Sequence, residues 1–420
     1  MDRSGAPASA ARPGAFQAPR RPWQGRRVLL GVTGGIAAYK SIQIARDLTL
    51  LGASVDVVLT HSARAFVGAV TFEALTGRPV HTEIVAEGHA LDHIRLAREA
   101  DVICIAPATA DFMARAANGR ADDLLTAILL ATHAPVVICP AMNDRMWAHA
   151  QTQANAAHLR TLGYVLAGPA AGPLAHGEGS GPGRVLEPEQ IVEHIGRALA
   201  PDSPLRGRSV VVTAGPTREA VDAVRVLTNR SSGRMGYALA AAAWRRGADV
   251  TLITGPTELT APVGANVVAA ETAADLEAAV RQGLPSADVL VMAAAIADFR
   301  PAAPRQGKIK KDNAPDALPL EPAPDVLRAT RDARPPHLVT IGFALESDNG
   351  IDNARAKLSG KGLDLVVLNP AGAADAGFEA DTNRVTLVTN DKAEELPLAS
   401  KHDVAEAILD RIEALLARQS

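Results

Sequence analysis

The sequence predicts an α/β protein with two doubly wound domains in tandem, each built on a mostly parallel β-sheet. Short apolar runs rich in Val, Ile and Leu alternate with helical patterns, as in parallel strands joined by crossover helices. The first such run, residues 27–30, leads into a glycine turn and a helical pattern. The pattern then starts again: residues 209–216 repeat the first strand and turn, and residues 245–254 parallel residues 51–60.

Composition argues against several classes of protein. With 420 residues, of which 47% are hydrophobic and 21% charged, the chain can form two or three globular domains. A net charge of −3 and an aromatic content of 3% argue against a nucleic-acid partner. No apolar run reaches the roughly 18 residues that a membrane span needs. Cys104 and Cys139 both lie in apolar runs, which indicates reduced, buried thiols and a cytoplasmic location.

Changes in composition predict the domain boundaries. Residues 1–25 are rich in Ala, Pro and Arg, and we expect them to form a disordered tail. The first domain is expected at residues 26–198, a linker at residues 199–206 and the second domain at residues 207–418.

The first glycine turn indicates a mononucleotide site. Gly34 and Gly35 follow the first strand, and a helical pattern runs from Ile36. The G-x-G-x-x-G fingerprint of dinucleotide binding is missing, and the second strand ends near Thr60 and Ser62 instead of an acidic residue. Hydroxyls and the N–H groups of a helix start suit a phosphate, so FMN fits better than NAD. The alternative is that the glycine turn serves only the close packing of strand and helix, as in many α/β folds.

The next predicted strand is followed by a second loop, which we expect at the same carboxyl edge of the sheet as the glycine turn. Residues 101–106 form a buried strand, followed by Pro107, Thr109 and Asp111. His93 precedes this strand and is a candidate proton carrier, because imidazole titrates near neutral pH. The alternative is that His93 is an ordinary polar residue.

Residues 134–147 (APVVICPAMNDRMW) combine a buried strand with an amide just beyond it. Asn143 stands among Met142, Met146 and Trp147, which we expect to keep water out. In such a pocket Asn143 would bind a substrate carboxylate and favour its loss as carbon dioxide. The alternative is an asparagine that bonds its own backbone in a turn.

Residues 168–184 are rich in glycine and are predicted to form a mobile loop, either a linker or an active-site lid. This segment contains His176 and ends at Arg184, a candidate clamp for an anionic substrate.

The second domain carries a candidate anion site. Residues 229–236 (NRSSGRMG) precede an alanine-rich helix, which suits either an anion cradle or a simple helix cap with a close-packing glycine. Asp298 ends a strand and is a candidate magnesium ligand, while the lysines of residues 308–311 (KIKK) would neutralise a triphosphate. No Walker A motif is present, which excludes an ordinary P-loop ATPase.

Together the motifs resemble one family, the bifunctional phosphopantothenoylcysteine decarboxylase and phosphopantothenate–cysteine ligase of bacterial coenzyme A synthesis. The resemblance covers about residues 26–411 and implies tandem Rossmann-like, flavodoxin-like domains. It rests on residues 31–40 (GVTGGIAAYK), 93–94 (HI), 106–109 (APAT), 140–147 (PAMNDRMW), 229–236 and 308–311, which occur in that order.

For the first half, the resemblance implies an FMN-dependent decarboxylase that converts phosphopantothenoylcysteine to 4′-phosphopantetheine. FMN would oxidise the cysteinyl thiol to a thioaldehyde and later return the hydride. His93 matches the active-site histidine and Asn143 the carboxylate-binding amide, with Met142 and Arg184 as further substrate contacts. The positions that match or neighbour flavin contacts are Gly34, Gly35, Ile36, Thr60, Ser62, Pro107, Thr109 and Asp111.

For the second half, the resemblance implies that CTP activates 4′-phosphopantothenate as an acyl-cytidylate, which the cysteine amine then attacks. Asn229 matches a contact to this intermediate, and Ser231, Ser232 and Gly233 would hold the substrate phosphate. Asp298 would also hold Mg²⁺, and Lys308 would be catalytic. The nucleotide-binding positions are Asp298, Lys308, Pro324, Asp325, Val326, Phe343, Lys357 and Lys361.

Three residues depart from the family pattern. Asp111 stands where asparagine is frequent, and Ala323 replaces an asparagine in the N-P-D-I stretch. His176 stands where the family often has a proton-donating cysteine. Histidine can also donate a proton, which makes His176 a candidate donor for the last step of the decarboxylase.

The resemblance further implies a cytoplasmic homo-oligomer of decarboxylase trimers linked by ligase dimers, up to a dodecamer, with flavin at a subunit boundary. Its partners would be small molecules, with neither nucleic acid nor membrane. Two alternatives stay open. One is a ligase whose flavin-binding first half is inactive and regulatory, which His176 favours. The other is a nicotinamide-dependent oxidoreductase on tandem Rossmann folds, which the missing fingerprint disfavours.

Overall fold

The computed structural model describes residues 20–85, 90–310, 316–346, 349–370 and 380–418. The chain divides into two compact units, Arg20–Pro201 and Asp202–Ser420. Most of the predicted tail (residues 1–19) and Lys311 of the KIKK motif lie outside the described residues. No helix in the described part of the chain is long and apolar enough to cross a membrane.

The first unit is built on a six-stranded parallel sheet with the order β3-β2-β1-β4-β5-β6. The strands are β1 (Arg27–Val32), β2 (Ser54–Leu59), β3 (Val80–His81), β4 (Val102–Ala108), β5 (Val136–Pro140) and β6 (Val165–Leu166). The helices are α1 (Tyr39–Leu50), α2 (Ala69–Thr76), α3 (Asp92–Glu99), α4 (Ala110–Ala117), α5 (Leu124–Ala131), α6 (Asp144–Ala148), α7 (Ala150–Thr161) and α8 (Pro188–Ala198), with short 3₁₀ turns η1 (Ile36–Ala38) and η2 (Ser62–Ala65). The strand order reverses at β1, between β2 and β4, where doubly wound sheets bind ligands.

Both faces of this sheet are buried. Along β1, Leu30 packs into one hydrophobic cluster and Leu29 into the other, because successive side chains of a strand point to opposite faces. This explains why its strands read as continuous apolar runs instead of alternating ones. The predicted fold class is confirmed.

The glycine-rich segment predicted as a mobile loop is instead a β-hairpin. Strands β7 (Ala170–Pro173) and β8 (Ser180–Arg184) pair antiparallel. Gly172 and Gly183 have φ angles of +157° and +147°, which few other residues adopt. The prediction was wrong because this ladder is made by backbone groups and has no apolar periodicity to reveal it.

The second unit has an eight-stranded sheet with the order β13-β12-β9-β14-β17-β18-β20-β21, in which all neighbouring strands are parallel except the pairs β18–β20 and β20–β21. These strands are β9 (Ser209–Ala214), β12 (Asp249–Thr254), β13 (Asn266–Ala269), β14 (Val289–Met292), β17 (Val339–Glu346), β18 (Leu365–Pro370), β20 (Thr386–Val388) and β21 (Ala393–Glu395). Smaller pairs are β10 (Arg218–Ala220) with β11 (Val226–Thr228), β15 (Phe299–Pro301) with β16 (Leu320–Pro322), and β19 (Thr382–Asn383) with β22 (Ala399–Ser400). The helices are α9 (Arg234–Arg245), α10 (Ala273–Gly283), α11 (Val326–Ala329), α12 (Gly350–Lys361) and α13 (Lys401–Leu416), with 3₁₀ turns η3 (Leu284–Ser286) and η5 (Arg331–Ala333).

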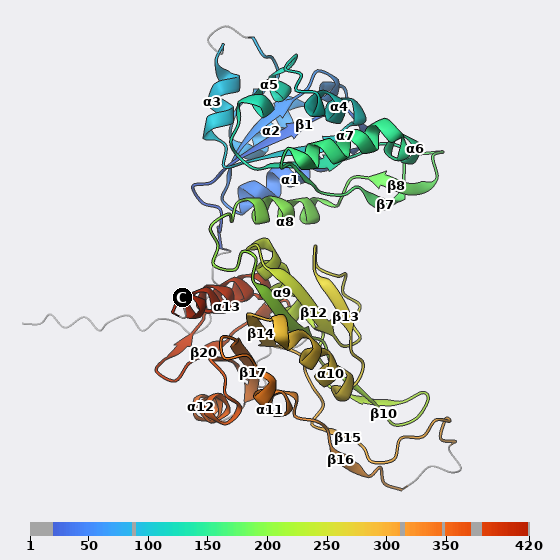
Figure 1. The fold of residues 1–420 in the computed structure, drawn as a ribbon, viewed down its shortest axis with the longest axis vertical. Helices are drawn as coiled ribbons and strands as arrows, with labels where there is room; N and C mark the ends of the chain where they lie inside the picture. Colours follow the sequence, from blue (N-terminus) through green and yellow to red (C-terminus); the bar gives the residue numbers. More distant parts are fainter. Residues whose placement is uncertain (1–19, 86–89, 311–315, 347–348, 371–379, 419–420) are drawn as a thin grey trace, which may run out of the picture. The chain divides into compact units, whose positions relative to one another are not determined.

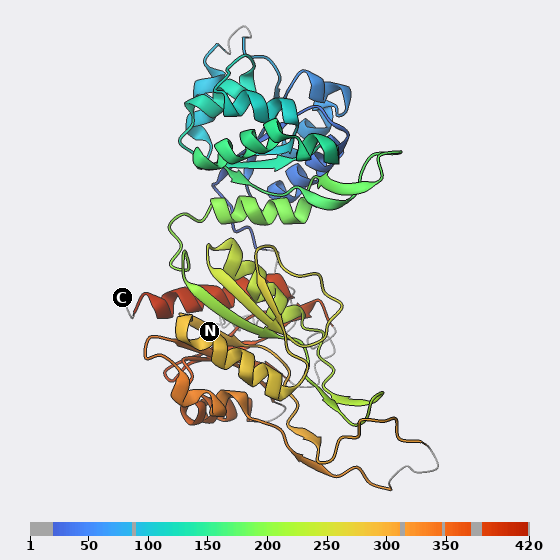
Figure 2. The ribbon, with the colours of Figure 1, turned by 45° about the vertical axis from the view of Figure 1, so that its right-hand side comes forward.

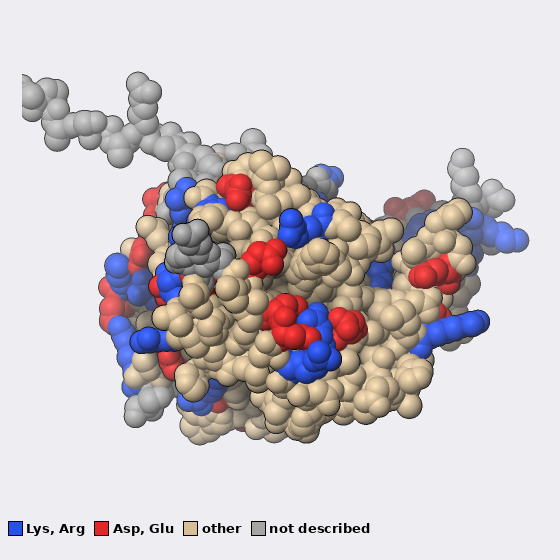
Figure 3. All heavy atoms as spheres, turned by 90° about the horizontal axis from the view of Figure 1, so that it is seen from above, with Lys and Arg blue, Asp and Glu red and all other residues tan. Residues whose placement is uncertain are grey.

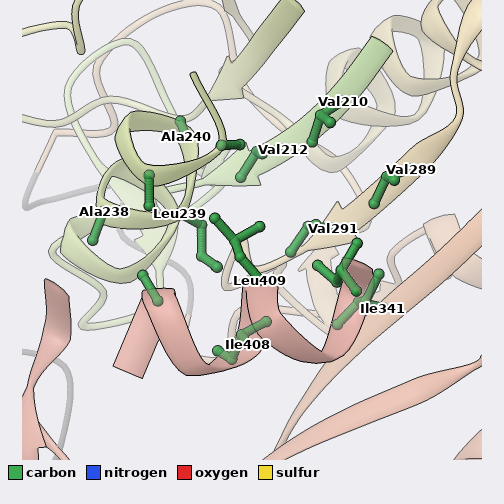
Figure 4. Packing of buried hydrophobic residues seen from close by; sticks show 14 of the residues in the cluster. Val210, Val212, Ala238, Leu239, Ala240, Val289, Val291, Ile341, Ile408 and Leu409 are labelled. Atoms are coloured by element: carbon green, nitrogen blue, oxygen red, sulfur yellow. The ribbon is translucent and has the colours of Figure 1, made fainter. Parts of the chain in front are cut away.

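Helices α9 and α13 cover one face of this sheet. Leu239 and Leu409 project from the two helices toward Val212 and Val291 of the strands (Figure 4). Just after the end of α9, Arg246 donates to Glu406 and to Asp410 within α13, the latter at 2.7 Å. Apolar burial and these ion pairs together fix the two helices against each other.

Charges on the surface are mixed. On the face drawn in Figure 3, basic and acidic side chains are interspersed among neutral ones instead of forming a patch of one sign.

Candidate functional site

The carboxyl edge of the first sheet brings the predicted flavin residues together. Thr33, at the end of β1, donates through Oγ1 to Pro107 O at 2.7 Å and accepts from Thr109 N at 3.1 Å. Thr109 in turn caps α4, with its Oγ1 accepting from Phe112 N. The turns after β1 and β4 are therefore held side by side.

A phosphate-bearing cofactor fits this edge. A Cβ added at Gly34 would lie 2.4 Å from Ser62 Cβ, so only glycine allows the turns after β1 and β2 to approach so closely. Thr60 Oγ1 donates to Val32 O at 3.3 Å and lies 3.4 Å from Ser62 Oγ. Backbone N–H groups at Gly35 and hydroxyls thus surround a small cradle of the kind that binds phosphate.

Two of the predicted flavin residues are more exposed than the cradle itself. Ile36 is 69% exposed at the start of η1. Asp111 lies in the first turn of α4, where its carboxylate pairs with Arg115 at 3.0 Å. The exposed side chain of Ile36 is free to cover the apolar ring of a bound flavin, whereas the carboxylate of Asp111 is already paired with Arg115.

Asn143 combines the two roles that the sequence left open. It is the N-cap of α6, and its Oδ1 accepts from Arg145 N at 2.9 Å. This bond fixes the amide so that Nδ2 is the group that can donate to a substrate carboxylate. The predicted apolar enclosure was wrong for Met146, which is 50% exposed, although Met142 and Trp147 pack against the core.

The β7–β8 hairpin is attached directly to this turn. Met142 N donates to Gly183 O at 2.9 Å, and a Cβ at Gly183 would lie 2.2 Å from Met142 O. His176 is exposed in the turn at the tip of the hairpin, where Leu174 N bonds Gly179 O. The hairpin therefore carries His176 on the same structural piece as the Asn143 turn.

The base of the hairpin is held by an ion-pair network that the sequence interpretation missed. Glu187 accepts from Lys40 at 2.9 Å and also pairs with Arg184. Lys40 is buried on α1, directly after the glycine turn. Arg184, predicted as a substrate clamp, is thus engaged within the chain. The signal in the sequence was a lysine on the mostly apolar, buried face of α1.

His93 lies apart from Asn143. It stands in the first turn of α3, and its Nδ1 is buried without a hydrogen-bond partner in the part of the chain that the structure describes. Neighbouring Asp92 pairs with His81 Nδ1 at 3.2 Å. Helix α3 and the α6–β8 region lie on opposite sides of this unit in both ribbon views (Figures 1 and 2). The two residues therefore stand on different elements of the unit, His93 on α3 and Asn143 at the start of α6.

The second unit has a cavity of about 870 Å³ at the carboxyl edge of its sheet. It gathers almost every residue predicted there. The predicted residues in its wall are Asn229, Ser231, Ser232, Gly233, Asp298, Pro324, Asp325, Val326, Phe343, Lys357 and Lys361. The cavity is large enough for a nucleotide together with part of a second substrate.

The start of α9 forms one wall of the cavity. Gly233 is the N-cap of α9, with φ of +78°, and its N–H donates to Ser231 Oγ at 3.3 Å. Asn229 Nδ2 donates to Ala295 O at 3.2 Å and to Ile296 O at 2.9 Å. These bonds tie the NRSSGRMG segment to the loop after β14.

Two lysines of α12 also line the cavity. Lys357 donates to Phe343 O at 2.6 Å, and burial followed by repulsion from Lys361 lowers its pKa from the usual lysine value. Lys361 pairs with Asp325 at 3.0 Å, and Asp325 also caps α11. An anionic ligand here would relieve the repulsion between the two ammonium groups.

Lys308 does not line this cavity. Its loop is anchored elsewhere, because Ile309 N donates to Asp222 Oδ2 at 3.0 Å. This bond, with others from Val224 and Arg225, holds the pKa of Asp222 far below its usual range. The described residues contain no cluster of three or more His, Cys, Asp or Glu that could hold a metal. A magnesium ion at Asp298 would therefore take most of its ligands from phosphate and water.

Comparison with known proteins decides the family. The model described as "Flavoprotein" matches residues 17–200, and "DNA/pantothenate metabolism flavoprotein C-terminal domain" matches residues 205–416. The coenzyme A biosynthesis bifunctional protein CoaBC of Vibrio cholerae is 43% identical over 392 residues, 92% of this chain and 98% of that protein. The CoaBC of Mycolicibacterium smegmatis is 47% identical over 410 residues, 94% and 99% of the two chains. The chain belongs to the CoaBC family. The resemblance based on its motifs is thereby confirmed, and with it a bifunctional enzyme of coenzyme A biosynthesis.

Two solved structures are similar to parts of this CoaBC-family chain. The crystal structure of a C-terminal domain of CoaBC is 36% identical and covers 52% of this chain and all of its own, with a TM-score of 0.45. A PPC decarboxylase mutant complexed with pantothenoylaminoethenethiol is 31% identical, covering 40% of this chain and 96% of its own, with a TM-score of 0.37.

Proposed function

We propose that residues 207–418 join cysteine to 4′-phosphopantothenate with CTP, and that residues 26–198 decarboxylate the product to 4′-phosphopantetheine with FMN. The observation that carries this proposal is the presence of two separate constellations, each at the carboxyl edge of its own sheet. The first has a phosphate cradle and a fixed amide, and the second has a cavity with cations at its wall.

In the ligase, the carboxylate of 4′-phosphopantothenate attacks the α-phosphorus of CTP and displaces pyrophosphate. The amine of cysteine then attacks the acyl-cytidylate, forms the amide and displaces CMP. Asn229 and the Ser231–Gly233 turn hold the acyl substrate, while Lys357 and Lys361 hold the nucleotide. Mg²⁺ at Asp298 would screen the phosphates.

In the decarboxylase, FMN would be held by the cradle of Gly34, Gly35, Thr60 and Ser62. When bound, it supplies the two-electron acceptor that this cleavage requires and that no side chain offers. Asn143 orients the substrate carboxylate through Nδ2 without adding a positive charge that would stabilise it. His93 is the proton carrier at the substrate thiol, and His176 donates the proton of the last step.

Both sites become complete only in a homo-oligomer. Helix α3, which carries His93, lies on the other side of the unit from α6 in Figure 1, and Lys308 lies outside the cavity it is expected to serve. A second copy would supply the missing side chain in each case, which fits decarboxylase trimers joined through ligase dimers. Two buried free cysteines, Cys104 and Cys139, support a cytoplasmic location.

Incubation of the intact protein with 4′-phosphopantothenate, cysteine, CTP, Mg²⁺ and FMN tests the assignment. We expect pyrophosphate, carbon dioxide and 4′-phosphopantetheine in equal amounts. Pyrophosphate with accumulation of phosphopantothenoylcysteine would instead indicate an inactive, regulatory first half. Reduction of a nicotinamide cofactor without pyrophosphate release would refute both assignments.

A further inference from the structure

His93, the proposed proton carrier, lacks a hydrogen bond at one of its two ring nitrogens. Its Nδ1 is buried and has no hydrogen-bond partner in the part of the chain that the structure describes. Histidines that act at a reaction centre are commonly oriented by a bond at their second ring nitrogen. The direction of the His93 imidazole therefore depends on the backbone that carries it, which is the first turn of α3.

The residue before His93 fixes this turn. Asp92 begins α3, and its Oδ2 lies 3.2 Å from His81 Nδ1, with both side chains only 10% exposed. Its Oδ1 accepts from Arg95 Nη2 at 3.0 Å. Because a carboxylate only accepts hydrogen bonds, His81 Nδ1 must carry a proton in this contact. His81 is thus a donor to Asp92 whether its imidazole is neutral or charged.

The contact with His81 differs from the contact with Arg95 in what it connects. Arg95 stands three residues after Asp92 on the same helix, so their ion pair stays within α3. His81 ends β3, the edge strand that pairs with β2, and it lies opposite Val58 in that pair. The bond from His81 therefore ties the start of α3 to the sheet.

The far end of α3 has a tether of its own. Glu99, the last residue of the helix, pairs with Arg27 at the start of β1 at 2.7 Å and with Arg95 at 3.2 Å. Between the two ends, Leu96 and Ala97 pack into a hydrophobic cluster of the first unit. The helix would thus stay in place without the His81 contact, and loss of that contact would affect mainly the first turn.

We propose that His81 is a positioning residue of the decarboxylase. By donating to Asp92 it fixes the first turn of α3, and this turn directs the imidazole of His93. His81 contacts neither substrate nor flavin in this role. The inference rests on the role proposed above for His93, and it adds the group that orients that residue.

Steady-state decarboxylation by the intact protein, with FMN and supplied phosphopantothenoylcysteine, tests this role. His81→Leu removes the donor, whereas His81→Asn places an amide N–H near the position of Nδ1. Glu99→Gln is the matched control, because it weakens the tether at the other end of the same helix. The equilibrium Kd of FMN, measured by flavin fluorescence, reports whether the first unit is correctly folded in each variant.

We expect His81→Leu to lower kcat about tenfold and to leave KM and the Kd of FMN unchanged, because a displaced proton carrier slows the reaction without weakening binding. His81→Asn should recover most of the rate, and Glu99→Gln should keep it. If His81→Leu does not fold, His81→Gln gives the same comparison, since its longer side chain places the amide near the position of Nε2 instead.

Three results would overturn the positioning role: wild-type kcat in His81→Leu, no recovery in His81→Asn, or an equal loss in Glu99→Gln. His93→Asn completes the series. If His93→Asn decarboxylates at the wild-type rate, the role proposed for His93 is itself wrong. If His93→Asn is inactive while His81→Leu is fully active, only the positioning role is refuted, so the two failures are distinguishable.

Discussion

The ammonium group of Lys40 lies 2.9 Å from Glu187 Oε2, and this contact joins the helix behind the flavin cradle to the base of the β7–β8 hairpin. Lys40 also lies 3.5 Å from Val185 O. Because Gly183, close to the same base, accepts from Met142 N beside Asn143, this ion pair helps to set how the His176 tip is placed relative to the cradle.

Glu187→Gln should slow decarboxylation by about fivefold, as expected when a partly exposed ion pair of ~1 kcal/mol no longer positions the hairpin. The hydrogen bond from Lys40 is the largest cause that lowers the pKa of Glu187 below its usual value. The pair is therefore intact at neutral pH and weakens only as pH falls below the ordinary glutamate range. Carbon dioxide release from phosphopantothenoylcysteine measures the effect, with exposed Glu178→Gln as the control. Equal rates for the two variants would contradict this role.

His176→Gln should lower formation of 4′-phosphopantetheine by about 100-fold or more, which is the usual contribution of a general acid. The substrate should still lose carbon dioxide, because the proton that His176 donates is needed only afterwards. Mass spectrometry of the products separates the two steps. His176→Cys, which introduces the residue frequent in the family, should restore product formation; if His176→Gln forms 4′-phosphopantetheine at the wild-type rate, another group donates the proton.

Asp222→Asn should weaken the ligase while leaving decarboxylation unchanged. Asp222 accepts from Ile309 N, Val224 N and Arg225, so its charge anchors the loop that carries Lys308. Since its pKa is held below the usual range, the anchor persists at neutral pH and is lost only in strong acid. Loss of charge-assisted bonds should raise KM for CTP about tenfold. Unchanged pyrophosphate release would show that the position of this loop does not matter for ligation.

Glu406→Gln should destabilise the second unit. Glu406 is buried between Arg245 and Arg246, and these two arginines lower its pKa although burial alone would raise it. Removing one member of a buried ion pair costs about 3 kcal/mol of unfolding free energy, whereas removing a half-exposed partner costs under about 1 kcal/mol. Asp410→Asn, which touches the same Arg246 from a half-exposed position, is the matched control. Urea unfolding followed by tryptophan fluorescence measures both, and equal small losses would contradict the buried role.

The sequence predicted the sheets and most of the second unit's cavity for a simple physical reason. Apolar β-branched runs mark buried parallel strands, and the polar residues that follow them must meet at one edge. The sequence did not predict the β7–β8 hairpin, because residues 170–184 have no hydrophobic periodicity. The ion pair of Lys40 with Glu187 was not predicted because the two residues stand more than 140 positions apart, and no local pattern encodes such a contact.

Separation of the two activities by single substitutions tests the central claim most directly. Asn143→Asp should abolish carbon dioxide release because a carboxylate repels the substrate carboxylate, while pyrophosphate release continues at the wild-type rate. Lys308→Gln should do the reverse, losing pyrophosphate release while supplied phosphopantothenoylcysteine is still decarboxylated. If either variant, correctly folded, loses both activities, the assignment of one reaction to each half of the chain is wrong.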